Sequence, residues 1–394
     1  MSLPPLKLKP REDKRLRAGH AWIFSNEVNV GATPLKAFAP GSLARVESDR
    51  GRPLGIAYVN PSALICARLL TRDTHAAIDR SWLQARVHQA VALRERLFPT
   101  PHYRAVFGES DGLPGLVVDR FGDMLAVQLN TAGMEALREP LLAAMEAELS
   151  PRTLVLRNDS PMRELEGLPQ HVEVLGPPPG EVEVCEGPAR FALRPEAGQK
   201  TGWYFDQRDN RLRLGRYVAD ARVLDVFSYV GAWGVQAALA GARAVTCLDS
   251  SAEALQGASD NAQRNGVAVE TRQGRALDEL KAMAAAGERF DVVVLDPPAL
   301  VKRRRDLPQG AEHYARLNRA AMQLLGEDGF LVSASCSQHM AGDHLQRLLA
   351  REARALGRGL QVLERCGQGA DHPVHPAMPE TAYLKAFYCR VCAP

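Results

Sequence analysis

Two short segments carry the residue types best suited to chemistry. Asp296-Pro297-Pro298 follows the apolar run 291–295, and Cys336, flanked by serines, follows the apolar run 329–333. Both runs are typical of buried strands, and ligands of an open parallel sheet bind just past the carboxyl ends of its strands. The sequence therefore predicts a carboxylate beside a rigid Pro-Pro wall and a thiol nucleophile in one crevice. Such a pair could attack a flipped pyrimidine base.

The elements that must position these segments alternate from about residue 190 onward. Strands are predicted at 223–226, 244–249, 291–295 and 329–333, and helices at 235–240, 252–265, 314–325 and 344–355. This alternation predicts an α/β domain built on a doubly wound, Rossmann-like parallel sheet.

The first 190 residues show a different pattern. Short β-type runs broken by Gly and Pro fill residues 1–72 and predict a small β-barrel. Residues 73–190 mix two helix signals with short strands, among them a pair around a tight Gly-Asp turn, and predict a small α+β domain. With 191–394 as the third, the chain is predicted to have three domains.

The first strand of the alternating region ends in a pattern suited to a cofactor. Asp225 precedes a small-residue turn containing Gly231, and Asp249 ends the next strand about 20 residues on, the spacing of an acid that binds ribose hydroxyls. An NAD site would need a G-x-G-x-x-G turn, which is missing after Asp225. One turn glycine with an acid favours S-adenosylmethionine, whose ammonium needs an acceptor. The alternatives are a helix N-cap for Asp249 and a simple strand-end acid for Asp225.

The bulk composition sets only wide limits. The chain has 394 residues, 46% of them hydrophobic and 24% charged, with a formal net charge of +3, which permits nucleic-acid binding without indicating it. Basic residues cluster between Lys7 and Arg17 and at 302–305, directly behind the Asp-Pro-Pro segment. An isolated basic run is usually a solvated loop, but a run beside a catalytic loop favours a polyanionic substrate.

No secretory signal and no run long enough for a membrane span is recognisable, so a cytoplasmic protein without membrane contact is predicted. Seven scattered cysteines argue against a disulfide framework. The segment Cys389-Arg390-Val391-Cys392 has no second ligand pair at suitable spacing, so no metal site is predicted and two strand cysteines are the simpler interpretation.

Eight short motifs are spread along the whole chain in a fixed order. They lie at 20–24 (His-Ala-Trp-Ile-Phe), 108–116, 200–211, 296–298, 335–337, 371–374, 379–380 and 383–385. In this order they resemble the motifs of the bacterial 23S ribosomal RNA cytosine-C5 methyltransferases of the RlmI-like family. The resemblance implies a PUA RNA-binding domain, a small middle domain and a class I S-adenosylmethionine-dependent methyltransferase domain.

The resemblance also implies a cofactor site. The residues that would line it are Lys200, Tyr204, Gln207, Arg208, Asp225, Phe227, Ser228, Gly231, Asp249 and Asp296. Two departures from the family pattern stand out. The turn ends in Ala232-Trp233, where the family usually has Gly-Phe, and Arg275 stands where an acid near the adenine is expected.

The activity implied is methylation of C5 of a cytosine, with Cys336 adding to C6 so that C5 becomes nucleophilic. Asp296 would bind the N3/N4 edge of the base, and Pro297 and Pro298 would shape its pocket. RNA phosphates would be held by the PUA-like domain, by the basic N-terminal run and by the run from Lys302 to Arg305, with Lys302, Arg303 and Arg304 as the named substrate-binding residues. The acceptor of the C5 proton stays open. His339 and His372 are candidates by chemistry alone, and structural histidines are the simpler interpretation for both.

Two other functions stay open. One is a ribosomal RNA base N-methyltransferase, which would not need Cys336. The other is a catalytically inactive ribosome assembly factor, favoured only by the bulkier turn and by Arg275. The partner implied by the resemblance is 23S ribosomal RNA or a large-subunit assembly intermediate, and the oligomeric state implied is a homodimer.

Overall fold

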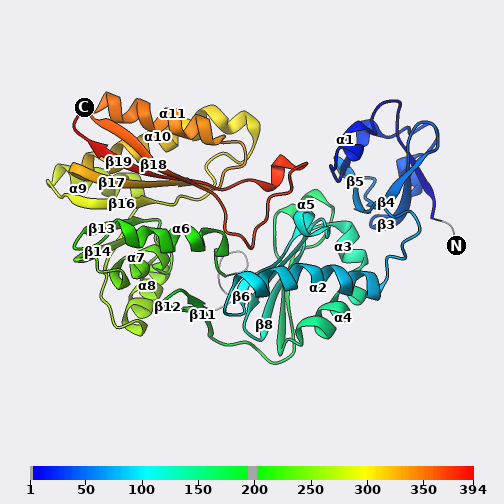
Figure 1. Ribbon diagram of the computed structural model, residues 1–394, viewed down its shortest axis with the longest axis horizontal. Coiled ribbons are helices and arrows are strands. Elements are labelled where there is room, and N and C mark those ends of the chain that lie inside the picture. Colours follow the sequence, from blue (N-terminus) through cyan, green and yellow to red (C-terminus); the bar gives the residue numbers. More distant parts are fainter. Residues whose placement is uncertain (1–2, 194–201) are drawn as a thin grey trace. The chain divides into compact units, whose positions relative to one another are not determined.

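A computed structural model of the protein describes residues 3–193 and 202–394. The chain forms two compact units, and each unit is made of several segments (Figure 1). The first unit comprises Met1–Val184, Leu193–Phe205 and Ala370–Thr381. The second comprises Cys185–Ala192, Asp206–Gly369 and Ala382–Pro394. The division into three domains stays a prediction.

The first unit begins with a five-stranded sheet in the order β1-β3-β4-β5-β2. Its strands are β1 (Pro5–Lys7), β2 (Trp22–Phe24), β3 (Ser42–Glu47), β4 (Pro53–Val59) and β5 (Ile65–Thr71), with the short helix α1 (Lys14–Arg17) between the first two. Apolar side chains of these strands form a core of their own. The β-rich structure expected for the start of the chain is confirmed.

A second five-stranded sheet of this unit has the order β10-β9-β8-β7-β6. Its elements in chain order are α2 (Arg80–Leu97), β6 (His102–Phe107), β7 (Leu116–Phe121), β8 (Met124–Leu129), α3 (Ala132–Ala136), α4 (Arg138–Leu149), β9 (Thr153–Asn158), α5 (Met162–Leu165) and β10 (His171–Leu175). Phe121 pairs with Met124 across Gly122 and Asp123, so the predicted hairpin with a Gly-Asp turn is confirmed. A two-stranded hairpin, β11 (Val182–Glu186) and β12 (Ala189–Leu193), follows.

The second unit is built on a seven-stranded sheet in the order β15-β14-β13-β16-β17-β19-β18. Its elements are α6 (Arg208–Arg213), β13 (Arg222–Val226), α7 (Ala232–Leu239), β14 (Ala244–Asp249), α8 (Ala252–Arg264), β15 (Glu270–Gln273), α9 (Ala276–Ala285), β16 (Phe290–Leu295), α10 (Leu307–Leu324), β17 (Leu325–Ser335), α11 (Gly342–Ala355), β18 (Gly359–Cys366) and β19 (Lys385–Cys392). The first five strands of the sheet order are parallel, and β19 is antiparallel to both of its neighbours. The doubly wound α/β fold is confirmed, but the sheet is mixed rather than wholly parallel.

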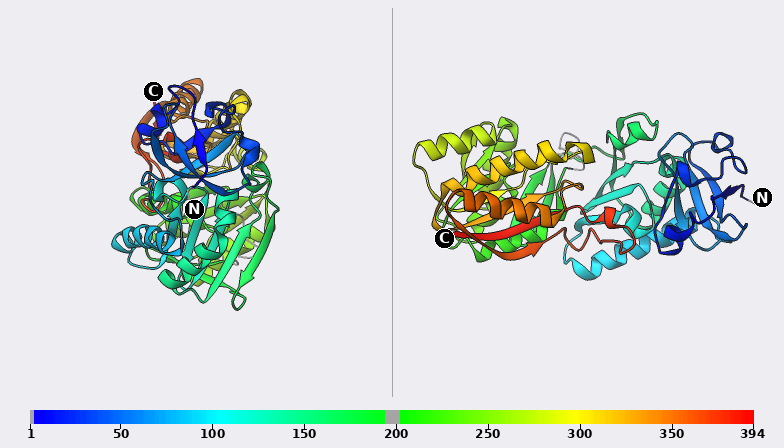
Figure 2. Two further views of the ribbon diagram at one scale, coloured as in Figure 1. Left: turned by 90° about the vertical axis from the view of Figure 1, so that its right-hand side faces the viewer. Right: turned by 90° about the horizontal axis from the view of Figure 1, so that it is seen from above.

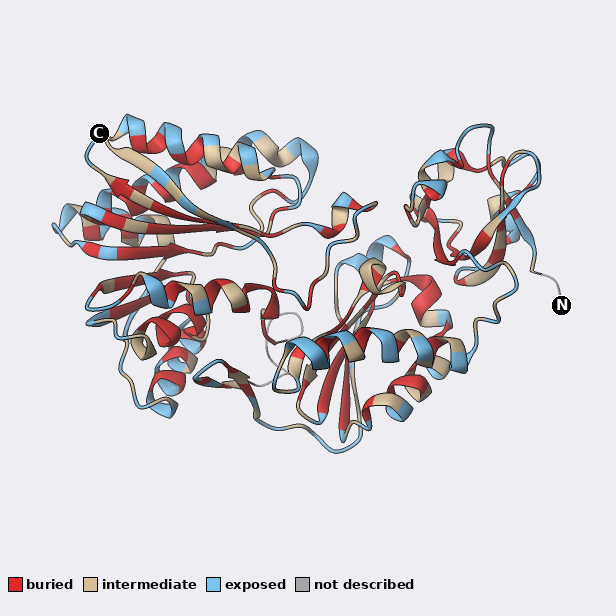
Figure 3. Ribbon diagram, viewed as in Figure 1, coloured by how far each residue is buried: buried red, intermediate tan, exposed pale blue. Residues whose placement is uncertain are grey.

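Helices cover both faces of this sheet. α10 and α11 lie side by side on one face with α9, and α7 and α8 lie on the other (Figures 1 and 2). The run 292–295 is apolar without alternation because both of its faces are covered, whereas Asp291 before it is exposed. Val292 and Val294 belong to the core beneath α7, and Val293 and Leu295 to the core beneath α10. Figure 3 shows the central strands of this sheet as mostly buried.

The C-x-x-C cysteines lie on strand β19, as the simpler interpretation held. Positions i and i+3 of a strand point to opposite faces, so Cys389 and Cys392 do not form a shared ligand pair. Among the residues that the structure describes, no helix combines the length and the apolar character that crossing a membrane requires.

Candidate active site

The two segments that were predicted to carry chemistry leave the same edge of the sheet. Leu295 at the end of β16 pairs with Ser333 of the adjacent, parallel β17. Asp296 and Cys336 follow these strand ends directly, and the sulfur of Cys336 lies 4.0 Å from the main-chain oxygen of Pro297. The structure therefore brings the carboxylate segment and the thiol together, while their catalytic roles stay predictions.

Both oxygens of the Asp296 carboxylate are fixed by neutral donors. The side-chain amide of Gln207 donates to Oδ1 at 2.8 Å, and the indole N–H of Trp233 donates to Oδ2 at 3.0 Å. Gln207 is itself held by the amide of Asn210, at 2.7 Å. Burial raises the pKa of the Asp296 carboxyl above its usual value, and the two N–H donors partly oppose that shift. Trp233, a departure from the family pattern, thus holds the carboxylate directly.

The serines on either side of Cys336 form buried hydrogen bonds. The hydroxyl of Ser335 donates to the hydroxyl of Tyr314 on α10 at 2.9 Å, and Tyr314 is 3.0 Å from the hydroxyl of Ser337. The main-chain N–H of Val301 also donates to Ser337 Oγ. Ser335, Ser337 and Tyr314 are all buried. These bonds fix the backbone on both sides of Cys336, which is itself half-buried.

Lys385 is a polar neighbour of Cys336 that sequence reasoning missed. Its ammonium donates to the main-chain oxygens of Ser337, at 2.6 Å, and Tyr383, at 2.7 Å. Burial lowers the pKa of Lys385 to about 8, and the charge of Cys336 acts in the opposite direction. The available signal was a lysine opening an apolar strand within the motif 383–385.

The turn after β13 has the backbone strain expected of a binding loop. Phe227 and Tyr229 have φ of 66° and 48°, and Gly231 has φ of 78°. Non-glycine residues rarely adopt positive φ, and such residues concentrate at functional sites. A Cβ on Gly231 would lie 2.8 Å from the Cβ of Ala258, so only glycine fits there. The turn leads into α7, whose first N–H groups face the carboxyl edge of the sheet.

Asp225 carries an unused acceptor at this turn. It is fully buried, and its Oδ2 accepts the N–H of Gly234 at 2.9 Å. Its Oδ1, and the hydroxyl of Ser228, have no hydrogen-bond partner among the described residues. Burial raises the pKa of Asp225 to about 7. An orphaned carboxylate oxygen in such a place fits the ammonium of a bound S-adenosylmethionine.

Asp249 ends β14 but does not cap the next helix. Its two oxygens accept the main-chain N–H groups of Tyr229 and Ser251, each at 3.0 Å. Ser251, not Asp249, is the N-cap of α8, so the N-cap alternative for Asp249 is wrong. The side chain of Arg275 is 89% exposed and lies 3.7 Å from the carboxylate of Asp278. Arg275 therefore points into solvent and does not fill the site.

The remaining predicted site residues lie in several different parts of the structure. Lys200 lies outside the described residues, and Tyr204 belongs to the first unit. Arg208 is buried at the start of α6, and Phe227 packs against the core beneath α10. The basic residues of the loop before α10 are fully on the surface, namely Lys302, Arg303, Arg304 and Arg305. Pro297 is buried and Pro298 exposed.

The two histidine candidates for the C5 proton have different surroundings. His339 is exposed in the loop after Cys336. His372 is buried in the first unit, where its Nδ1 lies 2.8 Å from the Asp371 carboxylate and its ring is 5.0 Å from that of Phe107. The structural interpretation of His372 is supported by these contacts.

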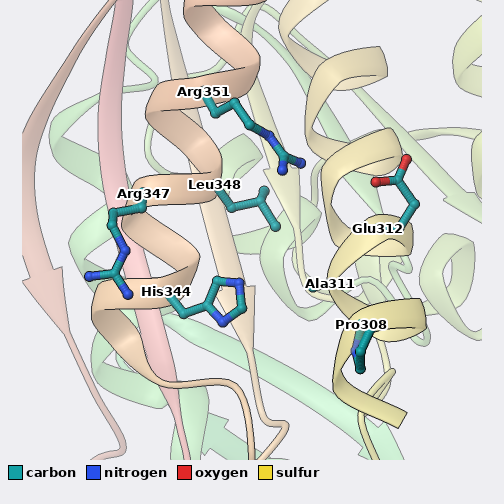
Figure 4. Close-up of a pocket in the computed structure, with 7 residues that line it drawn as sticks. All are labelled: Pro308, Ala311, Glu312, His344, Arg347, Leu348 and Arg351. Carbon is teal, nitrogen blue, oxygen red and sulfur yellow. The ribbon is translucent and has the colours of Figure 1, made fainter.

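A surface pocket lies between α10 and α11 (Figure 4). It has a volume of about 250 Å³ and is lined by Pro308, Ala311, Glu312, His344, Arg347, Leu348 and Arg351. None of the predicted site residues belongs to it.

The fold and the site define a class I S-adenosylmethionine-dependent methyltransferase. A family model described as an S-adenosylmethionine-dependent methyltransferase matches residues 161–390, and a PUA-like domain model matches residues 6–72. A solved structure from Streptococcus mutans, assigned as a SAM-dependent methyltransferase, superposes with a TM-score of 0.83 at 18% identity, covering 98% of this chain and 100% of that one. A second, a methyltransferase complexed with SAH, gives 0.82 at 18% identity with the same coverage.

Curated relatives define the family more narrowly. The ribosomal RNA large subunit methyltransferase I of Klebsiella pneumoniae (strain 342) is 38% identical over 98% of both chains. The protein of the same name from Shewanella amazonensis is 37% identical over 98% of this chain and 99% of its own. The chain belongs to the ribosomal RNA large subunit methyltransferase I family, and its cofactor is S-adenosylmethionine.

Proposed function

We propose that the protein methylates C5 of a cytosine in 23S ribosomal RNA, through a covalent adduct between Cys336 and C6 of the base. The observation that carries the proposal is the meeting of Cys336 and the Asp296-Pro297-Pro298 segment at the carboxyl edge of one sheet. The large-subunit RNA named for the family members supplies the substrate class.

Cytosine C5 is too weak a nucleophile to accept a methyl group unaided. The Cys336 thiolate donates an electron pair to C6, and the electrons of the C5=C6 double bond become available at C5. Bound S-adenosylmethionine supplies the electrophilic methyl group. A base then takes the proton from C5, the electrons of the C5–H bond restore the C5=C6 double bond, and the C6–S bond breaks to return the Cys336 thiolate. Two easier steps replace one difficult step.

Asp296 is suited to hold the base during these steps. Each carboxylate oxygen has two lone pairs, and Gln207 and Trp233 occupy one on each. A remaining pair can accept the N4–H of cytosine. Burial also raises the pKa of Asp296, which favours sharing a proton with N3 as charge develops on the ring.

Contacts with the rest of the RNA would come from basic surfaces. The exposed run Lys302 to Arg305 follows the Asp-Pro-Pro segment directly, and the PUA-like region offers a second basic cluster. In that cluster Arg15 and Arg17 already pair with Glu27 and Asp13. Phosphate contacts of this kind position RNA without choosing sequence. The proposed substrate is 23S ribosomal RNA, either free or within a large-subunit assembly intermediate. The proposed oligomeric state is a homodimer.

The direct test supplies methyl-labelled S-adenosylmethionine and 23S ribosomal RNA from cells that lack the endogenous enzyme. We expect label in 5-methylcytidine, and none with Cys336→Ala. Label in another nucleoside would reject the thiolate mechanism. Label that survives Cys336→Ala would favour the alternative of a base N-methyltransferase.

The alternative of an inactive assembly factor loses its two supports. Trp233 in the bulkier turn makes a useful bond to Asp296, and Arg275 lies in solvent. Failure to bind S-adenosylmethionine in a calorimeter would revive it. Binding without transfer to naked RNA would point to an assembled particle as substrate.

A further inference from the structure

Lys385 is placed where the chemistry of Cys336 needs help. It opens β19, which runs antiparallel to β17, and it pairs directly with Ser335, the residue before Cys336. Its side chain lies on the α11 side of the sheet, since a Cβ on Gly342 would be 3.5 Å from Lys385 Cγ. The lysine and the cysteine therefore sit at the end of two paired strands.

The Lys385 nitrogen has a fixed position. It donates to the main-chain oxygens of Ser337 and Tyr383, and the described residues include no carboxylate paired with it. A neutral amine has two N–H groups and one lone pair. The two carbonyls accept two N–H groups. The remaining position on the nitrogen is a lone pair in the neutral amine and a third N–H in the ammonium.

Other titratable groups on this side of the sheet do not compete. Besides Cys336, they are Glu312, His313 and Tyr314 on α10, Asp343, His344 and Glu352 on α11, and the arginines of both helices. Of these, Cys336 is the one whose charge acts on Lys385. Tyr314 is buried, and burial raises its pKa, so its hydroxyl stays neutral near pH 7. With its pKa lowered to about 8, Lys385 has an accessible neutral form near physiological pH.

We propose that Lys385 is a positioning residue that keeps Cys336 in its reactive form, by taking the proton from Sγ onto Nζ and holding the resulting thiolate with the new ammonium. One S–H bond breaks and one N–H bond forms, so the thiol and amine become a thiolate–ammonium pair with no outside reactant. Thiolates are stabilised by an adjacent cation. This inference rests on the proposed function, because it assumes that Cys336 is the nucleophile.

The test measures Cys336 and not methyl transfer. The rate of alkylation of the Cys336 peptide by iodoacetamide is followed by mass spectrometry from pH 6 to 10, for the wild type, Lys385→Met and Lys385→Arg. Lys385→Met should slow alkylation at pH 7 by about tenfold or more and move the midpoint up by roughly one pH unit, because only the thiolate reacts. Lys385→Arg keeps a cation and should retain most of the wild-type rate.

Each outcome decides something. Identical profiles for the wild type and Lys385→Met overturn the proposal. If the profile shifts but the wild-type protein makes no 5-methylcytidine, the role of Lys385 is supported and the proposed function is rejected. If Lys385→Met lowers the thermal midpoint or loses SAH binding, Lys385→Gln, which keeps a neutral N–H donor, replaces it, and the same pH profile decides.

Discussion

At the scale of single residues, the site depends on side chains whose partners come from distant parts of the sequence. Asp296 is held by Gln207, from the segment before α6, and by Trp233, on the first turn of α7. Neither contact follows from spacing in the chain. The resemblance implies Phe as the usual residue at the position of Trp233, and the indole N–H is a donor that Phe lacks.

Trp233→Phe tests that donor. The ring remains, but one hydrogen bond to a carboxylate is lost, and we expect kcat to fall by about tenfold, on the order of 1.4 kcal/mol. Because the indole N–H opposes the rise in the pKa of Asp296, the limb of the pH profile that reports Asp296 should move to higher pH. Trp82→Phe, on α2 of the first unit, is the control. An unchanged pH profile would make the contact merely structural.

Asp225 should make cofactor binding depend on pH. Burial raises its pKa to about 7, so the free protein holds it protonated below that pH and ionised above. A cofactor ammonium binds the ionised form, hence affinity for SAH should strengthen by up to about tenfold per unit as pH rises toward 7, and then level off. Calorimetry from pH 5.5 to 7.5 measures this. Asp225→Asn should bind weakly with no such slope, and a flat wild-type profile would contradict the assignment.

The raised pKa of Asp225 also makes the free energy of unfolding depend on pH. A carboxyl whose pKa is raised in the folded state favours folding at low pH, and the contribution is lost as pH rises from about 4 to about 7. In the absence of cofactor, Asp225→Asn should therefore gain stability relative to the wild type at pH 8 but not at pH 4. Urea unfolding at the two pH values checks the difference.

At the scale of elements, the loop between β16 and α10 combines the Asp-Pro-Pro segment with four exposed cations. Replacing Lys302, Arg303 and Arg304 by Ala should raise KM for RNA with kcat preserved. Each lost phosphate contact should reduce the salt slope of binding by roughly 0.7 for single-stranded RNA. The matched control removes the same charge near the amino ends of the strands, by Arg243→Ala, Lys281→Ala and Arg289→Ala. Equal losses in both variants would mean non-specific attraction only.

Elements with strong apolar patterns could be predicted, and others could not. β14 has the predicted bounds, 244–249, because its apolar run is buried on both faces. β15 was missed because it is a polar strand at the sheet edge. α10 begins seven residues earlier than predicted. Its first turn contains Pro308, which a helix start tolerates, and Gly310, which packs against Leu300 and Val301.

The site shows the same division. The placement of Asp296 and Cys336 at one edge of the sheet could be predicted, because each follows a recognisable strand and parallel neighbours end at the same edge. Lys385 could not, because the antiparallel insertion of β19 beside β17 is a long-range pairing that periodicity does not report. The proposed reaction follows from the family resemblance and not from the pattern of strands.

At the scale of the whole molecule, the segment Ala370–Thr381 belongs to the first unit although β18 and β19 on either side belong to the second. Within the first unit, Asp371 accepts the main-chain N–H of Arg104 at 2.9 Å, and its carbonyl accepts the guanidinium of Arg94 at 2.8 Å. Arg94 also makes two bonds to the Asp111 carboxylate and is fully buried. The motifs at 108–116 and 371–374 thus meet in one buried ionic cluster.

Arg94→Met should destabilise the first unit by about 3–5 kcal/mol, because the buried Asp111 carboxylate would lose its counter-ion. Urea unfolding followed by circular dichroism measures the change. Arg17→Met is the control. The Arg17 side chain is 51% exposed and pairs with Asp13 four residues earlier at 2.6 Å, and such exposed pairs contribute about 1 kcal/mol or less. Similar values for both variants would show that the cluster carries no special stability.

The division of the chain also bears on descent. The backbone passes from one unit to the other at five points, between Val184 and Cys185 and again after 192, 205, 369 and 381. A gene fusion or recombination with a single breakpoint between residues 206 and 369 would leave both units incomplete. The two units should therefore be inherited together, and a transplanted catalytic half would need to bring 370–381 and a replacement for what that segment binds.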